Sequence, residues 1–206
     1  MLHISKHPLI MDKIAKLRNK DTDVTSFKRT MKEVAMLLAY EVTCDFPTKE
    51  LKIKTPLGNA LCRIISKDIV IVAILRAGLG LVEGLLEVIP NAKQAHIGIY
   101  RDEETLKPVK YYLRFPLSLQ NTYVIIADPM LATGGSAVEA VNIVKSRGAK
   151  NIYFLSVISS KFGIDFLRKH HPDIKIYTGV VDDKLNDNGY IVPGLGDAGD
   201  RMFGTF

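Results

Sequence analysis

The strongest constraint on the fold of this chain is a series of continuous apolar runs that alternate with helical patterns. The run DIVIVAIL, residues 68–75, is apolar at every position after its first, which indicates a strand buried on both faces. Similar runs follow at 95–100, 121–128, 151–159 and 174–181, and the segments 78–89, 136–148 and 161–171 between them predict helices. This order predicts an α/β fold, with a mostly parallel central sheet and helices on both faces.

The first third of the chain adds a helix and a hairpin. Apolar residues at 27, 31, 34 and 38 recur at helical spacing, so residues 25–40 are expected to form a helix that Thr22 or Asp23 caps. Residues 52–65 predict two short strands on either side of the turn sequence Pro56–Asn59. No repeat or linker divides the sequence, and residues 1–206 are therefore predicted to form a single domain.

Composition excludes several classes of protein. The longest continuous apolar run, Ile69–Leu75, is far shorter than the roughly 20 residues of a membrane-spanning helix. The N-terminal segment lacks the uninterrupted apolar core of a secretory signal. Cys44 and Cys62 have no metal-site spacing and are expected to be reduced thiols. A cytoplasmic protein without a membrane partner is expected.

The net charge of +6 comes from 28 basic and 22 acidic residues and favours anionic partners. The basic residues are dispersed, however, and no aromatic-plus-basic pattern of an RNA-binding module is present. Most of this charge is therefore expected on a solvated surface, and no nucleic-acid partner is predicted.

The loop after the run at 121–128 carries the clearest chemical signal. It reads ADPMLATGGS, residues 127–136, and ligands of parallel sheets bind beyond the carboxyl ends of the strands. Residues 133–136, Thr-Gly-Gly-Ser, offer backbone N–H groups at a helix start and two hydroxyls, which suit a phosphate dianion. Asp128 would repel a phosphate, so its carboxylate suits the vicinal hydroxyls of a ribose; the alternative is simple Asp-Pro turn chemistry. The loop predicts a ribose 5-phosphate site.

This segment resembles the phosphoribosyl pyrophosphate motif of the phosphoribosyltransferases. The common form of the motif has two adjacent acids where this chain has Asp128 and Pro129, which leaves one carboxylate for the ribose. The resemblance implies that phosphoribosyl pyrophosphate is bound by Asp128, Pro129, Met130, Leu131, Ala132, Thr133, Gly134, Gly135 and Ser136.

The loop after Leu75 places Arg76 at another strand end, where its guanidinium fork suits a pyrophosphate. The alternative is a dinucleotide site, because Gly78, Gly80 and Gly84 fall near the glycine fingerprint and Asp102 follows at the distance of a ribose-binding acid. The third glycine has one spacer too many for that fingerprint, and the fingerprint does not explain Arg76. A pyrophosphate site is therefore preferred.

The segment after Tyr100 is polar and charged and returns as YYLRFP, residues 111–116. It predicts a hairpin flap over residues 101–115, with Arg101 at the strand end on the same edge as Asp128. A cationic flap that closes over a pyrophosphate would also exclude water.

The C-terminal stretch has five of the 15 glycines within the last 18 residues. It is expected to be an ordered loop, since it carries six residues that favour burial: Tyr190, Ile191, Val192, Leu195, Met202 and Phe203. Ordered glycine-rich loops present backbone groups closely to a partner, and a flat heterocycle such as a pyrimidine can be read by backbone groups alone.

Taken together, these motifs show that the chain resembles the uracil phosphoribosyltransferase family over residues His7 to Thr205. The motifs are Arg76–Gly80, Arg101 with Glu103, Glu104 and Thr105, Asp128–Ser136, and Gly189–Asp200. The segment Ser159–Gly163 departs from the family pattern, but it is outside the substrate-contact motifs.

The resemblance implies that uracil and phosphoribosyl pyrophosphate are converted to UMP and pyrophosphate, with Mg²⁺ held through the substrate and no metal site of the protein's own. It implies catalytic roles for Arg76, Arg101, Asp128 and Asp197, and the same four residues are implied as ligands of phosphoribosyl pyrophosphate. The implied uracil contacts are Ile191, Gly196, Asp197 and Ala198. Some relatives are activated by GTP, and relatives form homodimers or larger homo-oligomers. No histidine falls in a matching motif.

Two other functions are weighed against this one. A regulator on the same fold would sense phosphoribosyl pyrophosphate and bind nucleic acid, but the sequence has no added segment or clustered basic face for that role. A related transferase for orotate would need a cation in the base pocket, where Asp197 supplies an acid instead. A related transferase that uses a purine is the other alternative.

Overall fold

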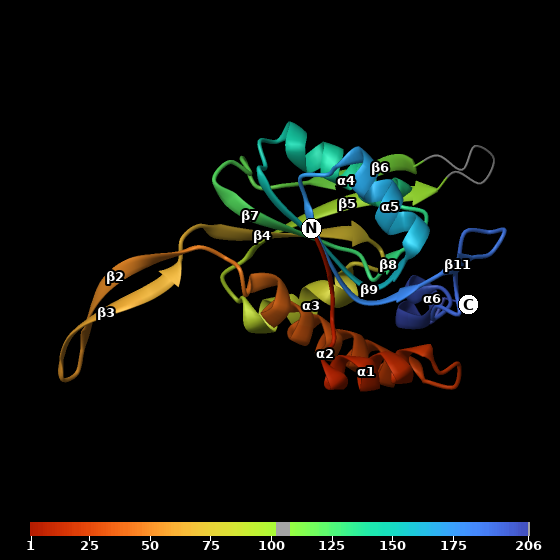
Figure 1. Cartoon of the computed structure of the whole chain (residues 1–206), viewed down its shortest axis with the longest axis horizontal. Helices are drawn as coiled ribbons and strands as arrows, with labels where there is room; N and C mark the ends of the chain where they lie inside the picture. Colours follow the sequence, from red (N-terminus) through yellow and green to blue (C-terminus); the bar gives the residue numbers. More distant parts are fainter. Residues whose placement is uncertain (102–107, 206) are drawn as a thin grey trace.

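The computed structural model describes residues 1–101 and 108–205, which form a central sheet with the strand order β1-β10-β9-β7-β4-β5-β6 and β8 paired to β9 (Figure 1). The strands of this sheet are β1 (Leu2–Ile4), β4 (Asp68–Leu75), β5 (Lys93–Arg101), β6 (Pro108–Arg114), β7 (Thr122–Ala127), β8 (Met130–Leu131), β9 (Asn151–Ser160) and β10 (Lys175–Asp182). All pairs in it are parallel except β5 with β6. The predicted mostly parallel sheet is confirmed.

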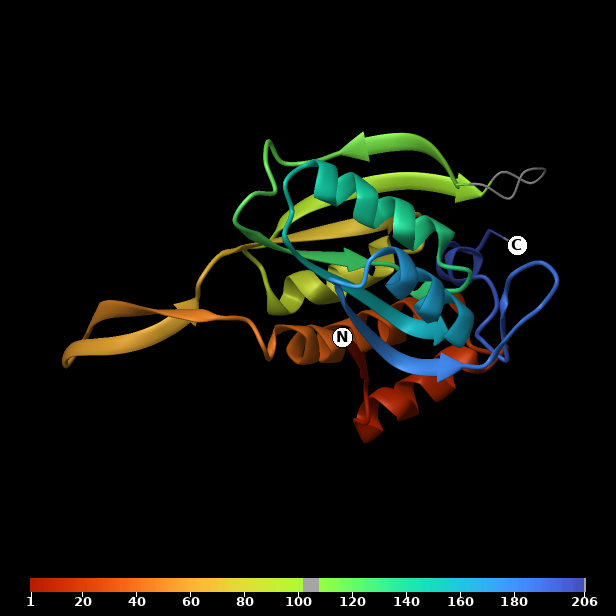
Figure 2. The same ribbon diagram turned by 45° about the horizontal axis from the view of Figure 1, so that its top comes forward.

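Helices cover both faces of the sheet, as predicted (Figure 2). One face carries α1 (Pro8–Arg18), α2 (Val24–Thr43) and α3 (Leu79–Val88), and the other carries α4 (Gly135–Ser146) and α5 (Lys161–His170). Because side chains alternate along a strand, Ile71 of β4 packs in the first layer and Val72 in the second. Burial on both faces explains why the strands are continuously apolar.

The helix predicted over residues 25–40 is α2, which begins one residue earlier and ends three residues later than expected. Asp23 is its cap, since its Oδ1 accepts a hydrogen bond from the Ser26 N–H at 2.9 Å. The buried face carries Phe27, Met31 and Leu38, at the helical spacing seen in the sequence. No helix in the described parts of the chain is long and apolar enough to span a membrane.

The three glycines of the rejected dinucleotide fingerprint allow close packing. A Cβ atom at Gly84 would overlap the Lys32 carbonyl oxygen of α2, and one at Gly78 would lie 2.5 Å from the Ala127 carbonyl oxygen. A Cβ atom at Gly80 would overlap the Met202 side chain. These contacts hold α3 against α2, β7 and the C-terminal segment, so the glycines are explained without a dinucleotide.

The predicted hairpin consists of β2 (Thr48–Thr55) and β3 (Gly58–Ile65) and projects from the body at the end of the sheet away from the C-terminal segment (Figures 1 and 2). The C-terminal segment forms the two-stranded ladder of β11 (Lys184–Leu185) and β12 (Ile191–Val192), followed by α6 (Ala198–Phe203). The sequence predicted a glycine-rich loop here, and α6 is therefore an addition to that prediction.

Candidate active site

The segment after β7 runs back along β9 and is fixed by backbone hydrogen bonds. The Asp128 N–H donates to the Leu155 carbonyl at 3.1 Å, and the Pro129 carbonyl accepts from the N–H groups of Val157 and Ile158, both at 3.0 Å. Pro129 and Leu131 are buried, and Leu131 packs in the core under α4. Neither of these two side chains lines the pockets described below.

The start of α4 has the geometry of an anion cradle. Gly134 adopts a φ of +85° as the residue before the helix, and no side chain caps the helix. The first N–H groups of a helix have no partner within it, so a ligand can take their place. A Cβ atom at Gly135 would meet nothing within 4 Å, which means that open space lies beside these groups.

The segment that departs from the family pattern supports this cradle from behind. The Ser160 hydroxyl donates to the Ala132 carbonyl, and it accepts from the Gly163 N–H at 2.8 Å as the cap of α5. A Cβ atom at Gly163 would overlap the Ala132 carbonyl oxygen, so α5 approaches the cradle closely. The departure therefore lies next to the cradle, although it has no side chain in either of the two pockets described below.

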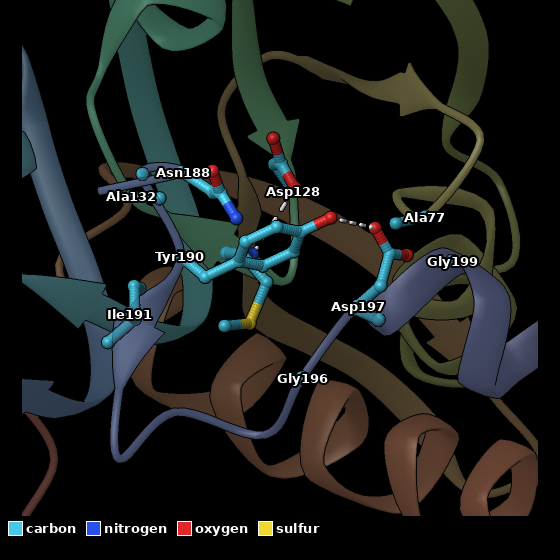
Figure 3. A pocket seen from close by; sticks show the side chains of 12 residues that line it. Ala77, Asp128, Ala132, Asn188, Tyr190, Ile191, Gly196, Asp197 and Gly199 are labelled. Carbon is cyan, nitrogen blue, oxygen red and sulfur yellow. Dashed lines mark hydrogen bonds between the residues drawn. The ribbon is translucent and has the colours of Figure 1, made fainter. Parts of the chain in front are cut away.

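Two pockets meet at the carboxyl ends of β4 and β7, and Figure 3 shows the first of them. The loop pocket, about 320 Å³, is lined by Ala77, Asp128, Met130, Ala132, Asn188, Gly189, Tyr190, Ile191, Gly196, Asp197, Ala198 and Gly199. The strand-end pocket, about 390 Å³, is lined by Ile74, Leu75, Arg76, Ala77, Ile99, Tyr111, Asp128, Ser136, Asp197 and Gly199. Asp128 and Asp197 belong to both, so these carboxylates stand where the two pockets join.

Asp128 is held in an environment that disfavours its charge. Burial, with a smaller contribution from the nearby Asp197 carboxylate, raises its pKa to about 7, and the hydrogen bond from the Met130 N–H at 3.2 Å opposes both effects only in part. A carboxyl group of this kind gains from ligand hydroxyls or a cation that stabilise its ionised form. Perturbed acids at the junction of two pockets are typical of active sites.

Asp197 and Tyr190 form the mouth of the loop pocket. Asp197 caps α6 by accepting from the Asp200 N–H at 2.9 Å, and the Tyr190 hydroxyl lies 3.5 Å from its other oxygen. The negative charge of Asp197 raises the pKa of Tyr190. Figure 3 shows the Tyr190 ring lying between Asp128 and Asp197, across the pocket.

This arrangement corrects part of the burial prediction for the C-terminal segment. Ile191, Leu195 and Met202 are buried as expected, whereas Tyr190, Val192 and Phe203 are 45%, 43% and 36% exposed. Tyr190 faces the ligand space instead of the core, and Val192 lies on a two-stranded ladder with one open face. Apolar character predicted burial for all six and could not separate these cases.

Arg76 follows β4 and lines the strand-end pocket. Its Nη2 atom donates to Asp200 Oδ1 at 3.1 Å, and its guanidinium lies 5.9 Å from the centre of the Phe203 ring. The side chain is 56% exposed, so it is accessible to a ligand in the pocket. Asp200 was not among the predicted site residues, because the sequence alone does not show that it pairs with an arginine 124 positions away.

The structure thus brings together Arg76, Asp128, Ser136, Asp197, Ile191, Gly196 and Ala198, as the motifs predicted. Met130 and Ala132 line the loop pocket rather than the strand-end pocket. Arg101 ends β5, but its side chain and residues 102–107, which carry Glu103, Glu104, Thr105 and part of the predicted flap, lie outside the described residues. Asn188 and Tyr190 were missed as pocket residues; the available signal was that Tyr190 lies in the motif Gly189–Asp200 and Asn188 directly precedes it.

In this parallel sheet an acid and an open helix start follow one central strand, and an arginine follows the neighbouring strand. This combination defines the class of the phosphoribosyltransferases. A structure of adenine phosphoribosyltransferase from Leishmania donovani shares the fold, with a TM-score of 0.60, 16% identity, and coverage of 91% of this chain and 86% of that one. The sequence model of the uracil phosphoribosyltransferase family matches residues 4–205, and the chain belongs to this family.

Individual relatives are similar over their whole length. The uracil phosphoribosyltransferase of Dictyoglomus turgidum is 52% identical over 206 residues and covers 100% of both chains. That of Clostridium perfringens is 54% identical over 200 residues, 97% of this chain and 96% of its own. A solved structure of a protein from Aquifex aeolicus has a TM-score of 0.95 and 38% identity and covers 100% of this chain and 99% of that one.

Proposed function

We propose that this chain is a uracil phosphoribosyltransferase that converts uracil and phosphoribosyl pyrophosphate to UMP and pyrophosphate. The junction of two pockets at Asp128 and Asp197 carries this proposal. One pocket is rich in backbone groups and suits a flat base, and the other has an arginine and an open helix start, which suit a phosphorylated sugar. Full-length identity to enzymes of that name supports the same reaction.

The sugar and its phosphate are assigned to the segment after β7. The 5-phosphate accepts hydrogen bonds from backbone N–H groups of residues 132–136 and from the Thr133 and Ser136 hydroxyls. The ribose hydroxyls donate to the Asp128 carboxylate, which stabilises its ionised form against the raised pKa. The acid and the cradle together orient the anomeric carbon toward the loop pocket.

The pyrophosphate is assigned to Arg76, with Arg101 as a further contact that stays a prediction. As the bond from the anomeric carbon to the pyrophosphate oxygen breaks, negative charge grows on the leaving group, and a guanidinium stabilises it. The cationic charge on Arg76 is partly balanced by Asp200 until a ligand arrives.

Mg²⁺ fits this site as an ion that enters with the substrate. No group of three or more His, Cys, Asp or Glu side chains within residues 1–101 and 108–205 is placed to hold a metal. Asp128 and Asp197 offer carboxylate oxygens where the pockets join, and substrate oxygens and water suit the remaining positions. When bound, Mg²⁺ would neutralise pyrophosphate charge.

The uracil is assigned to the loop pocket, with backbone groups of Ile191, Gly196 and Ala198 along its edge. Backbone N–H and C=O groups match the alternating acceptors and donors of a pyrimidine. Tyr190 covers the pocket and offers an aromatic face, and its hydroxyl holds Asp197 near the reacting carbon. In this arrangement the ring nitrogen loses its proton to water and forms its bond to the anomeric carbon as the pyrophosphate departs.

The direct test is conversion of radiolabelled uracil to UMP by the purified chain with Mg²⁺ and phosphoribosyl pyrophosphate, with and without GTP. We expect turnover, and hypoxanthine and orotate should not compete with uracil. Binding of phosphoribosyl pyrophosphate without any uracil consumption would overturn the proposal in favour of the sensor that binds nucleic acid. A response to GTP would establish the activator, which stays a prediction, as does the cytoplasmic location.

A homo-oligomer is proposed on the basis of the projecting hairpin. Opposite residues of an antiparallel pair share one face, and Leu51 pairs with Cys62, Ile53 with Ala60 and Ile64 with Lys49. That face is an apolar stripe, and Leu51, Ile53 and Ile64 are 42%, 40% and 38% exposed. A two-stranded hairpin is only marginally stable by itself. We infer that a second copy of the chain covers this stripe.

Lysine at both Leu51 and Ile53 should therefore shift the chain from an oligomer toward a monomer in analytical ultracentrifugation, because two charges would be buried in the interface. Leu61→Lys is the matched control, since Leu61 pairs with Lys52 on the opposite face of the hairpin and is 60% exposed. An unchanged sedimentation coefficient in the double variant would contradict the proposed interface.

Alanine at Gly134 should lower the stability of the protein, whereas alanine at Gly135 should weaken ligand binding. Gly134 has a φ of +85°, and a Cβ atom would lie 3.0 Å from the Gly163 carbonyl oxygen, so Gly134→Ala should lower the free energy of unfolding by about 1–2 kcal/mol. Gly135→Ala should leave stability unchanged but place a methyl group in the cradle and weaken binding of phosphoribosyl pyrophosphate at least tenfold. Thermal unfolding and titration calorimetry measure the two effects, and tight binding by Gly135→Ala would refute the cradle.

A further inference from the structure

Gly194 and Leu195 lie in the loop between β12 and α6, and they are held by arginines that line neither pocket. Gly194 has a φ of +54°, and a Cβ atom there would overlap the Ile191 carbonyl oxygen, so the loop turns tightly at this point. Gly196, which lines the loop pocket, follows directly. Whatever fixes Gly194 and Leu195 therefore fixes the backbone that faces the base.

Arg18, the last residue of α1, holds Gly194 together with Asp182, the last residue of β10. Its Nη1 atom donates to Asp182 Oδ2 at 2.8 Å and to the Gly194 carbonyl at 2.9 Å, and its Nη2 atom donates to Asp182 Oδ1 at 2.7 Å. The Gly194 N–H donates to Asp182 Oδ2 at 3.0 Å. Both backbone groups of this glycine are thus bound by one ion pair.

Arg201, in α6, holds the next residue of the loop. It donates from Nη1 to the Leu195 carbonyl at 2.8 Å and to the Leu17 carbonyl, and from Nη2 to the Asn19 carbonyl at 2.6 Å. Its guanidinium lies 4.4 Å from the centre of the Phe27 ring of α2. This arginine therefore ties the loop to the end of α1, beside the residue that binds Gly194.

The ion pair is buried enough to be rigid. Asp182 is 8% exposed, and although burial alone would raise its pKa, the hydrogen bonds from Arg18 and the Gly194 N–H hold it below the usual value. The planar guanidinium matches the two carboxylate oxygens, and a third N–H remains for the Gly194 carbonyl. A lysine has a single nitrogen and cannot reproduce this fork.

We propose that Arg18, Asp182 and Arg201 are positioning residues that set the affinity for uracil by fixing the backbone of Gly194 and Leu195 from behind. The inference rests on the proposed function and deepens it. The three residues act through the loop and touch no substrate. The phosphate cradle starts α4 and Arg76 follows β4, and the hydrogen bonds of the three side chains reach neither of these elements.

The test compares Arg18→Lys and Arg201→Lys with wild-type protein in full kinetics over both substrates. We expect the KM for uracil to rise about tenfold or more in each, with the KM for phosphoribosyl pyrophosphate and its calorimetric affinity within twofold of wild type. Arg168→Lys is the control, because Arg168 is an exposed arginine in the last turn of another helix, α5.

The outcomes separate the two proposals. No UMP from the wild-type protein overturns the proposed function and this inference with it. Turnover by the wild-type protein with an unchanged uracil KM in both variants overturns the inference alone. A parallel rise of both KM values with a lower Tm would show a merely structural role and also overturn it. If Arg18→Lys does not fold, the same split in Arg201→Lys decides.

Discussion

Asparagine at Asp128 is expected to lower uracil turnover by two to three orders of magnitude, with a higher KM for phosphoribosyl pyrophosphate. The carboxylate stands where the two pockets join, and an amide cannot offer two anionic acceptors to the ribose hydroxyls or stabilise positive charge on the sugar. Steady-state kinetics with both substrates varied measure the loss. Asp165→Asn removes one negative charge from an exposed position on α5 and should leave the rate unchanged.

The same substitution should stabilise the free protein at pH 8. The pKa of Asp128 is raised from 3.8 to about 7, so the native state binds the proton more tightly than the unfolded state and stability falls as the pH rises from about 4 to 7. Above pH 7 the full cost is present. One pKa unit corresponds to about 1.4 kcal/mol, and solvent access through the pocket reduces the total, so Asp128→Asn should gain about 1–2 kcal/mol at pH 8 and little at pH 4.

The affinity for phosphoribosyl pyrophosphate should rise with pH, whereas the stability of the free protein falls. Below pH 7 Asp128 is protonated in the free protein and accepts hydrogen bonds poorly, so affinity for phosphoribosyl pyrophosphate should rise between pH 6 and 8 in wild-type protein. The variant corrects for ionisation of the ligand itself and should show a flatter profile. Equal profiles, or a variant less stable than wild type at pH 8, would mean that Asp128 is an ordinary turn residue.

The features predicted from sequence are those encoded in contiguous residues. The sheet was readable because β4, β7 and β9 are apolar without interruption, and the phosphate loop because acid, spacer and glycines follow one another within ten positions. The α2 helix was readable because its buried side chains recur at a single period and Asp23 precedes them. Each signal is local, and the strands and helices predicted outside the flap at 101–115 formed where they were expected.

Features that depend on distant contacts were not readable. Arg18 meets Asp182 and Gly194 across 164 and 176 positions, and no local pattern marks such a pair. Tyr190 was expected in the core because an aromatic ring counts as apolar in any pattern, whereas in the fold its hydroxyl meets Asp197 and its ring lies over the pocket. Family motifs nominated candidate site residues, but which pocket each one lines followed only from the fold.

Glutamine at Arg76 is expected to impair the use of pyrophosphate-bearing ligands and to leave the affinity for UMP nearly unchanged. The guanidinium lines the strand-end pocket and is 56% exposed, and its partner Asp200 is an exchangeable contact in water. Loss of its charge should lower kcat/KM for phosphoribosyl pyrophosphate by about two orders of magnitude, since charge on the leaving group would no longer be stabilised. The reverse reaction of UMP with pyrophosphate should fall by a similar factor.

UMP carries no pyrophosphate, so its affinity in Arg76→Gln should remain within twofold of wild type when measured by titration calorimetry. Asp200→Asn is the matched control: it removes the partner of Arg76 but keeps the guanidinium, and should retain most activity. A variant that binds UMP and phosphoribosyl pyrophosphate equally poorly would indicate that Arg76 holds α6 in place through Asp200. Selective loss of the pyrophosphate ligands would place the leaving group beside β4, at the end of the strand-end pocket that Arg76 lines.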